Sequence, residues 1–438
     1  MGLLPGLLAG CGTPGDFAAK ATVTPTPGTP TPGTPTPGTP TPGTPTPGTP
    51  TPGTPTPGTP TPGTPTPGTP TPGTPTPGTP TPGTPTPGTP TPGAPAPSPS
   101  GGMPARFIGD SFIADDGARL PLRKWLPKNR VAAVILALHG FNDYSNAFAM
   151  PATIWAAHGI ATYAYDQRGF GGAPERGLWP GEGRLAVDAI TATRILRRAY
   201  PGRPVYLLGE SMGGAIATLA MTGTMRGVLP GPDGMPMADA DGVILSAPAV
   251  WGRPTMDLLP RIALFAAARF FPTMVLTGRG LKIVASDNLP MLRALSRDPM
   301  VLKGARVDTI YGLVDLMDDG LAAASRLEAP TLLLYGAHDQ VVPRRPIEQF
   351  AEHLPPEPDN PRRLAYYPHG YHMLLRDLDG AAVAGDVAGW ILDRAAPLPS
   401  HADAAAASTP GHRITQATAD PPAPRFLPKP LAPARARR

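Results

Sequence analysis

Short apolar runs separated by polar and glycine-rich turns recur along the chain from residue 107 onward. Most of these runs are continuously apolar rather than alternating, which is typical of strands buried on both faces. They predict strands at residues 107–114, 120–126, 131–138, 161–165, 205–208, 242–246, 331–335 and 364–367. Spacing and composition favour helices at residues 188–200, 215–221 and 382–392. Strands that alternate with helices predict an α/β fold with a mostly parallel central sheet and helices on both of its faces.

One long stretch interrupts this alternation. Residues 249–327 are largely apolar and compatible with helices, and no clear strand pattern lies inside them. Their length predicts a helical cap inserted after the sixth strand. The alternative is that these helices are ordinary covering helices of the sheet.

Composition divides the 438 residues into unlike parts. Pro 67 and Gly 52 together make up about a quarter of the chain, a share typical of low-complexity sequence, and most of them precede residue 104. Residues 24–93 repeat the pentad Thr-Pro-Thr-Pro-Gly, in which proline removes backbone donors, so we expect an extended, disordered linker at 24–103. A leader and tether at 1–23 precede it, and a folded domain at 104–396 and a tail at 397–438 follow it.

The formal net charge of +5 comes largely from the tail. Residues 397–438 contain six Lys or Arg and two Asp or Glu, so the folded part is close to neutral. We find no basic helix and no interleaving of basic and aromatic residues, which argues against nucleic-acid binding. We expect the tail to be disordered and solvated, with contact to anionic lipid as the alternative. No apolar run reaches the roughly 18 residues of a transmembrane helix.

The sole cysteine, Cys11, excludes an internal disulfide and a cysteine-based zinc site. It follows a short apolar segment that ends Leu8-Ala9-Gly10. This resembles the lipobox of bacterial lipoproteins, in which small residues precede an acylated cysteine. The resemblance implies a lipoprotein anchored to a membrane of the cell envelope through Cys11. The segment lacks the positive start of a signal peptide, since its first basic residue is Lys20, and the alternative is an accidental Leu-Ala-Gly-Cys.

The chain is organised around residues 205–214, Val-Tyr-Leu-Leu-Gly-Glu-Ser-Met-Gly-Gly. A buried strand, a turn between glycines and a helix follow one another here. This is the setting of a nucleophile elbow with the pattern Gly-x-Ser-x-Gly. Ser211 is therefore the candidate nucleophile. The alternative is a structural serine, because a chain this rich in glycine can produce the pattern by chance.

A serine hydroxyl needs a neighbouring base, and the base needs a group that orients it. In this architecture the acid and then the histidine follow the serine along the chain. Asp339 is the only acid in the turn after the next-to-last strand, so it is the candidate acid; the alternative is a loop-capping aspartate. Two histidines, His369 and His372, follow the last strand. Gly370 lets the chain turn and favours His372 as the base. We expect His369 to be a loop residue that supports the site and His338, beside the acid, to be a wall residue.

Two backbone N–H groups are expected to bind the oxygen that becomes negative in such a reaction. One belongs to Met212, the residue after the candidate nucleophile, and the other to Phe141, in the loop after the third strand. We expect His139 to hold this loop rather than to act as a base. No His, Asp or Glu cluster has the spacing of metal ligands, so no metal is expected, and no loop suits a phosphate.

With these residues the chain resembles the α/β-hydrolase superfamily, and within it the monoacylglycerol lipase and lysophospholipase group, also called serine aminopeptidase-like hydrolases. The resemblance covers residues 107–394, and its motifs are His139-Gly140-Phe141, residues 165–171, residues 209–214, residues 336–343 and Gly370-Tyr371-His372. It implies an α/β-hydrolase fold, a triad of Ser211, Asp339 and His372, no cofactor, and ester hydrolysis through an acyl-enzyme. Asp166 and Arg168 match a turn that is usually structural in this group. Glu210 stands where the group often has histidine.

The substrate class stays open at this point. The apolar residues of 249–327 suit an acyl chain, as in monoacylglycerol or a lysophospholipid, but plain packing of the cap explains them equally well. An aminopeptidase or an acyltransferase would use the same fold. A surface-displayed binding protein on an inactive hydrolase scaffold is a further alternative.

Overall fold

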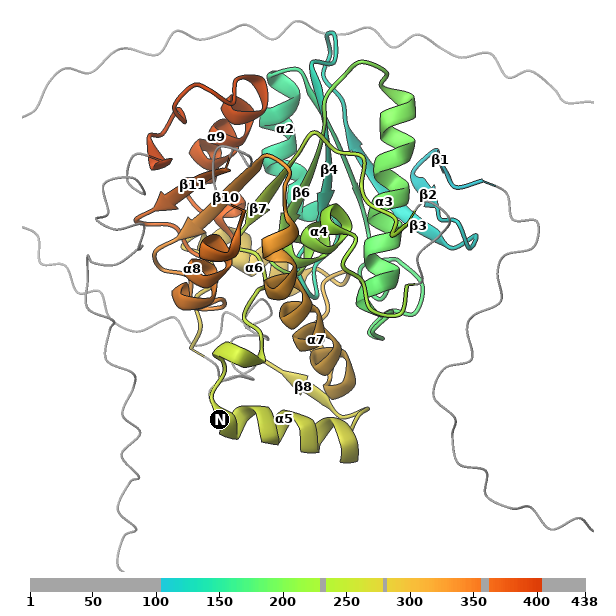
Figure 1. The fold of residues 1–438 in the computed structure, drawn as a ribbon, viewed down its shortest axis with the longest axis vertical. Helices are drawn as coiled ribbons and strands as arrows, with labels where there is room; N and C mark the ends of the chain where they lie inside the picture. The colour runs from blue at the N-terminus through green and yellow to red at the C-terminus, as the bar shows by residue number, and fades with distance from the viewer. Residues whose placement is uncertain (1–103, 229–233, 279–281, 356–361, 404–438) are drawn as a thin grey trace, which may run out of the picture. The chain divides into compact units, whose positions relative to one another are not determined.

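The computed structural model describes residues 104–228, 234–278, 282–355 and 362–403. Cys11, the repeat and the tail from residue 404 lie outside these residues, so what the sequence predicts for them stays a prediction. The core of the described part is one sheet (Figure 1). Its strands are β1 (Arg106–Ile108), β2 (Ser111–Ile113), β3 (Arg119–Trp125), β4 (Ala133–Leu138), β5 (Ile160–Tyr165), β6 (Val205–Glu210), β7 (Gly242–Ser246), β10 (Thr331–Gly336) and β11 (Arg362–Tyr367).

The sheet has the strand order β1-β2-β3-β5-β4-β6-β7-β10-β11. From β5 to β11 neighbouring strands are parallel, and β3 joins β5 in the antiparallel sense. β1 and β2 extend this antiparallel edge. The predicted α/β fold with a mostly parallel sheet is confirmed. In a parallel sheet the carboxyl ends of the strands meet at one edge, which is where the loops after β4, β6, β10 and β11 converge.

Helices cover both faces of the sheet. They are α2 (Ala149–Ala157), α3 (Glu182–Ala199), α4 (Met212–Thr222), α8 (Arg344–His353) and α9 (Gly380–Leu392). Side chains of β4 alternate between two cores: Val134 and Leu136 pack with α3, α4 and α8, and Ile135 and Ala137 pack with α2 and α9. In the described ranges, no helix is both long enough and apolar enough to span a membrane.

Several elements differ from the sequence-based prediction. Residues 107–114 form two short strands rather than one, because Gly109 adopts φ +51° and turns the chain between β1 and β2. Helix α3 begins at Glu182, ahead of the predicted residue 188. Helices α2 and α8 were not predicted. α8 buries only Pro346, Ile347 and Phe350, too few apolar positions to show a helical period.

The chain between β7 and β10 contains the predicted cap, and we keep that name for this segment. It contains η4 (Arg253–Thr255), α5 (Leu258–Phe270), β8 (Val275–Thr277), α6 (Leu289–Arg297), β9 (Gly304–Arg306), α7 (Val307–Ala323) and η5 (Ala324–Arg326). β8 and β9 form an antiparallel pair that the sequence analysis missed. α7 packs against α4 on its inner side and against α5 on its outer side. α7 therefore acts as a covering helix, whereas α5 and β8 lie beyond it, away from the sheet (Figure 1).

The described domain extends past the predicted boundary at residue 396. Leu398 and Ala402 are buried. The backbone N–H of Ser400 donates to Oδ1 of Asp386, in α9, at 2.8 Å. Residues 397–403 therefore pack on the domain and are not part of a tail.

Candidate active site

Ser211 lies alone in the turn between β6, which ends at Glu210, and α4, which begins at Met212. Its backbone has φ 53° and ψ −117°, a conformation that non-glycine residues seldom adopt. Strand, strained turn and helix follow one another as the motif requires. The turn presents the Ser211 side chain at the carboxyl edge of the sheet.

Two glycines allow this turn. A Cβ on Gly213 would lie 2.1 Å from the carbonyl oxygen of Leu138, at the end of β4. A Cβ on Gly209 would lie 2.2 Å from the carbonyl oxygen of Gly213. Both distances are far inside van der Waals contact, so β4, β6 and α4 can approach this closely only without side chains at these positions.

We expect Gly213→Ala to destabilise the protein by at least about 2 kcal/mol, because the new methyl group must push α4 away from β4. Gly385 in α9 is the matched control, since nothing lies within 4 Å of a Cβ built there. Gly385→Ala should leave stability unchanged or raise it by about 0.5–1 kcal/mol. Urea unfolding of both variants measures the difference, and equal stabilities would contradict this account of the turn.

His372 and Asp339 form a hydrogen bond. Nδ1–H of His372 donates to Oδ2 of Asp339 at 2.8 Å. The other carboxylate oxygen, Oδ1, accepts the backbone N–H groups of Val341 at 2.8 Å and Val342 at 2.9 Å. Asp339 is thereby held through both oxygens and orients the buried ring. With Nδ1 as the donor, Nε2 is left with a lone pair that can accept a proton.

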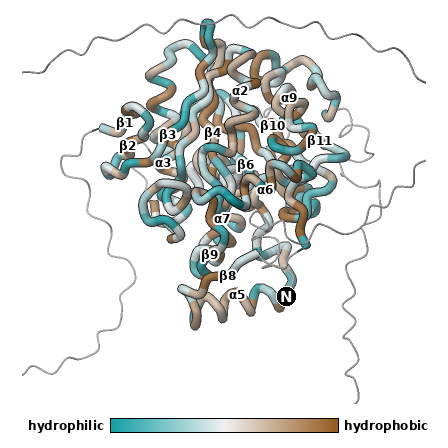
Figure 2. Tube along the Cα trace, turned by 180° about the vertical axis from the view of Figure 1, so that it is seen from behind, coloured by the Kyte–Doolittle hydropathy of each residue, from teal (hydrophilic) through white to brown (hydrophobic). Residues whose placement is uncertain are grey.

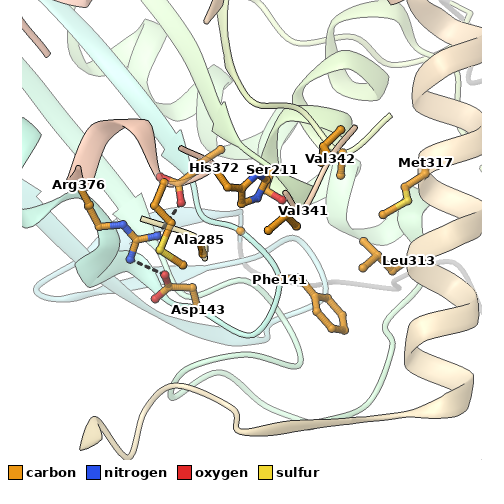
Figure 3. A pocket seen from close by; sticks show the side chains of 14 residues that line it. Phe141, Asp143, Ser211, Ala285, Leu313, Met317, Val341, Val342, His372 and Arg376 are labelled. Carbon is orange, nitrogen blue, oxygen red and sulfur yellow. Dashed lines mark hydrogen bonds and ion pairs between the residues drawn. The ribbon is translucent and has the colours of Figure 1, made fainter. Parts of the chain in front are cut away.

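Ser211 and His372 line the same pocket, which has a volume of about 50 Å³ (Figure 3). Their side chains lie next to each other, one from the elbow and one from the loop after β11. Asp339 stands behind His372 and does not line the pocket. The walls are mostly apolar, formed by Phe141, Ala249, Ala285, Leu313, Met317, Val341, Val342 and Met373. Three residues that are far apart in the sequence are thus brought to one edge of the sheet.

The two candidate backbone donors flank Ser211. A Cβ on Gly140 would lie only 3.4 Å from Cβ of Ser211, so the loop that carries Phe141 passes directly beside the elbow. The N–H of Met212 opens α4, where the first N–H groups have no acceptor within the helix. Within the described residues, no backbone hydrogen bond uses the N–H of Phe141. Both groups are therefore available to an oxygen atom bound beside Ser211.

His139 holds the loop before Phe141. Its Nε2 accepts the N–H of Gln167 at 3.0 Å, and its Nδ1 contacts the carbonyl oxygen of Gly140 at 2.8 Å. Burial lowers the pKa of His139, and the nearby carbonyl and carboxylates only partly oppose this effect. A neutral ring with both nitrogens engaged supports the loop, as expected, and has no free site for a proton.

The remaining histidines near the site have other environments. His369 is exposed and does not line the pocket. His338 is also exposed, and its ring packs edge-to-face on Tyr371 with a centroid distance of 5.2 Å. Across the described ranges, no three His, Cys, Asp or Glu side chains are placed to hold a metal ion.

Asp166 and Arg168 form hydrogen bonds that hold their turn in place. Oδ1 of Asp166 accepts the N–H of Ser145 at 3.0 Å, and Oδ2 accepts the N–H of Gly172 at 2.9 Å. Nε of Arg168 donates to Oδ2 of Asp188 at 2.6 Å. Neither residue lines the pocket.

Arg376, which the sequence analysis missed, links three segments around the pocket. Its Nη1 donates to Oδ2 of Asp143 at 2.7 Å, and its Nη2 donates to Oε1 of Glu210 at 2.6 Å. Asp143 lies two residues after Phe141, Glu210 directly precedes Ser211, and Arg376 follows His372 by four residues. We call these three residues the Arg376 cluster. Their exposed fractions are 7% for Arg376, 4% for Asp143 and 2% for Glu210, so the charges are removed from water.

The charges of the Arg376 cluster and of Asp339 change the pKa of His372. Burial lowers the pKa of its ring, but the charge and hydrogen bond of Asp339 raise it. Glu210 raises it further and Arg376 opposes that effect, and the net result is a raised pKa. The ring therefore holds a proton more tightly than a free histidine, which suits a group that must accept one.

The segment of the cap just before α6 is bonded to the loop that carries His372. The N–H of Met373 donates to the carbonyl oxygen of Ala285 at 2.9 Å. The hydroxyl of Ser286 donates to Oδ1 of Asp377 at 2.5 Å, and Oδ2 of Asp377 accepts the N–H of Tyr371 at 2.7 Å. The cap segment around Ala285 and the histidine loop are therefore held together.

The sheet topology and the turn at Ser211 define the class of protein, an α/β hydrolase. The chain belongs to the family described as serine aminopeptidase, S33, whose model matches residues 129–379.

Named relatives and solved structures resemble the same part of the chain. The monoglyceride lipase of Homo sapiens is 26% identical over 285 residues, which are 64% of this chain and 89% of the relative. The monoacylglycerol lipase of Mycolicibacterium smegmatis is 24% identical over 284 residues, 64% of this chain and 96% of the relative. A soluble variant of monoglyceride lipase from Saccharomyces cerevisiae, solved with a substrate analog, has a TM-score of 0.51 at 20% identity and covers 69% of this chain and 99% of its own. At that identity the structural match establishes the fold.

Proposed function

We propose that the protein is a serine hydrolase that cleaves carboxylic esters with an apolar acyl group, such as monoacylglycerol or a lysophospholipid. The observation that carries the proposal is the pocket that Ser211 and His372 line together, with Asp339 behind the ring and apolar walls around it. Membership of the family and the relatives named monoglyceride lipase support ester hydrolysis.

In the proposed mechanism, Oγ of Ser211 attacks the ester carbonyl carbon while Nε2 of His372 takes its proton. Asp339 keeps Nδ1–H and stabilises the positive ring. The carbonyl oxygen becomes negative and accepts the N–H groups of Met212 and Phe141, each of which contributes about 2.7–4 kcal/mol. The bond to the alcohol then breaks as His372 protonates the leaving oxygen. A water that gives its proton to His372 attacks the acyl-enzyme. His372 then returns this proton to Oγ of Ser211 as the bond to the acyl group breaks and the acid leaves.

The size of the pocket sets a condition on the substrate. Its volume of about 50 Å³ is far below the roughly 300 Å³ of pockets that enclose a drug-sized ligand. A long acyl chain therefore requires a wall to move. Initial rates on p-nitrophenyl esters of increasing length, on monoacylglycerol and on lysophosphatidylcholine test the substrate class. If the protein hydrolysed none of these esters, the proposed substrate class would be wrong.

The family description makes an aminopeptidase the specific alternative. Such an enzyme must bind the positive α-amino group of its substrate, for which a free carboxylate in the pocket is suited. The carboxylates that line the pocket, Asp143 and Glu210, are both bound to Arg376, which favours an ester substrate. A faster turnover of aminoacyl p-nitroanilides than of p-nitrophenyl esters would reverse this preference.

The raised pKa of His372 predicts the pH dependence. The base works only when neutral, so kcat/KM should fall as the pH drops through a midpoint above the ordinary histidine value of 6.5. Glu210→Gln removes a negative charge that raises this pKa, so its midpoint should move to lower pH. Glu348→Gln, which alters a carboxylate paired with Arg344 at the surface, is the control and should leave the midpoint unchanged. The profile is measured with p-nitrophenyl butyrate, and a midpoint below 6.5 in the parent, or one that Glu210→Gln leaves in place, would contradict the raised pKa of His372.

We also propose that Cys11 is acylated and anchors the protein to a membrane, on the strength of the Leu-Ala-Gly-Cys segment. More than one acyl chain on a residue gives stable attachment, whereas one chain gives marginal attachment. Cys11→Ser should move the protein from the membrane fraction to the soluble fraction of the producing bacterium. Ser211→Ala serves as the control and should stay with the membranes. Unchanged fractionation of Cys11→Ser would remove this part of the proposal.

A further inference from the structure

The loop that carries Phe141 needs support from outside. We call residues 139–144, between β4 and η3 (Ser145–Phe148), the oxyanion loop. Asn142, the residue after Phe141, has φ 66°, a left-handed conformation that persists where its neighbours hold it. Within the described ranges, the N–H of Phe141 forms no backbone hydrogen bond of its own. Its place beside Ser211 therefore depends on the bonds that the next residues of the loop form.

Two hydrogen bonds join the oxyanion loop to the cap. The hydroxyl of Tyr144 donates to Oδ2 of Asp298 at 2.6 Å. The backbone N–H of Leu302 donates to the carbonyl oxygen of Asn142 at 2.9 Å. The ring of Tyr144 is 6% exposed and packs on Val301. Burial and the hydrogen bond to Asp298 raise the pKa of Tyr144 to about 12, so the hydroxyl keeps its proton and donates at neutral pH.

The cap segment that forms these bonds is itself fixed to the domain. Nη2 of Arg176, in the loop between β5 and α3, donates to the carbonyl oxygens of Pro299 at 2.6 Å and Met300 at 3.1 Å. Oδ1 of Asp298 accepts the N–H of Met300 at 2.8 Å. Residues 298–302 are therefore held from a second side and can keep the oxyanion loop in place.

The same part of the cap also holds the histidine loop. Residues 285–302 are bonded at their start to Met373 and Asp377, in the histidine loop, and at their end to the oxyanion loop. Nδ2 of Asn288 adds a bond to the carbonyl oxygen of Arg376 at 2.9 Å. Helix α6 runs between the two ends, has no fully buried residue and lies on the side of the domain that faces the viewer in Figure 2. One cap segment thus bridges the loops of the base and of the backbone donor.

We propose that Tyr144 and Asp298 are positioning residues for the reaction. Their hydrogen bond holds the oxyanion loop against the cap, so that the N–H of Phe141 stays beside Ser211. This inference rests on the proposed function, in which that N–H binds the negative oxygen. Neither Tyr144 nor Asp298 lines the pocket, so their effect passes through Phe141. A donor displaced by about 1 Å loses much of its contribution, which is greatest in the transition state.

The kinetics of Tyr144→Phe test the proposal, because this variant lacks the hydroxyl and keeps the ring. With p-nitrophenyl butyrate, kcat should fall at least about tenfold while KM stays within about twofold. A trifluoromethyl ketone gives a second measurement. Oγ of Ser211 adds to its carbonyl carbon as His372 takes the proton, and the ketone oxygen becomes negative. The inhibition constant should therefore rise by about the factor by which kcat/KM falls.

Tyr163→Phe is the matched control. The hydroxyl groups of Tyr163 and Tyr200 lie 2.7 Å apart, and neither residue lines the pocket. Loss of this comparable hydrogen bond should leave kcat and the inhibition constant within about twofold of the parent. Asp298→Ala should reproduce the loss in Tyr144→Phe and replaces that variant if it misfolds. The double variant should lose little more than Asp298→Ala alone, because both substitutions break one bond.

Hydrogen exchange measures the loop without catalysis. Exchange in residues 139–144 should become faster in Tyr144→Phe and stay parental in Tyr163→Phe, and residues 205–214 should exchange as in the parent in both. A parent that hydrolyses no ester would refute the proposed function, and exchange alone then decides whether the pair holds the loop. In an active parent, an unchanged kcat and inhibition constant in Tyr144→Phe, or a rise in KM without a fall in kcat, would overturn the positioning role.

Discussion

Replacing Ser211 with alanine should lower kcat/KM for p-nitrophenyl butyrate by at least roughly 10⁴-fold. Alanine has no hydroxyl, so no acyl-enzyme can form. The hydrogen bond between His372 and Asp339 and the two backbone donors remain, and they leave only the small residual rate that binding and charge stabilisation supply. The thermal unfolding midpoint should stay close to that of the parent, because the substitution removes one atom and adds none.

Ser246 provides the matched control. It ends β7 beside Glu210, and its buried hydroxyl has no hydrogen-bond partner among the described residues. Ser246→Ala should therefore keep kcat/KM within about twofold of the parent. Parental activity in Ser211→Ala, or an equal loss in Ser246→Ala, would show that the hydroxyl of Ser211 is not the nucleophile.

Replacing Arg376 with methionine should cost about 3–5 kcal/mol of folding stability. The substitution leaves the carboxylates of Asp143 and Glu210 buried and without their counter-charge. It also cuts the link between the oxyanion loop, the elbow and the histidine loop, so kcat should fall with stability. Urea unfolding measures the first effect, and esterase assays under conditions where the variant is fully folded measure the second.

Two further variants show whether uncompensated charge is the cause. Arg376→Met combined with Asp143→Asn and Glu210→Gln removes all three charges and should recover most of the lost stability. Arg344→Met breaks the partly exposed pair with Glu348 and should cost no more than about 1 kcal/mol. If Arg376→Met were as stable as Arg344→Met, the Arg376 cluster would have no structural importance.

The sequence predicts the central sheet well for a physical reason. Strands buried on both faces require continuous apolar runs, and β4, β6, β7 and β10 are such runs, so their positions follow from composition alone. The candidate triad follows in the same way, because strand, glycine turn and helix around Ser211 are a local pattern with a known consequence. The loops that carry Asp339 and His372 are then found by counting strands.

The elements that the sequence does not reveal depend on contacts between distant residues. β8 and β9 are three residues each, too short for an apolar period to mark them. The Arg376 cluster joins residues from three separate loops, and neither Asp143 nor Arg376 lies in a motif. In the sequence, the sign of this cluster is Glu210, because a carboxylate in a buried turn needs a positive partner close to it.

The most direct test of the account is a peptide map after reaction with a fluorophosphonate, which bonds to an activated serine hydroxyl. We predict one adduct, on the peptide that contains Ser211, at a rate that falls strongly in His372→Ala. An unlabelled protein, or an adduct on any other residue, would contradict the central claim that Ser211 is activated by His372.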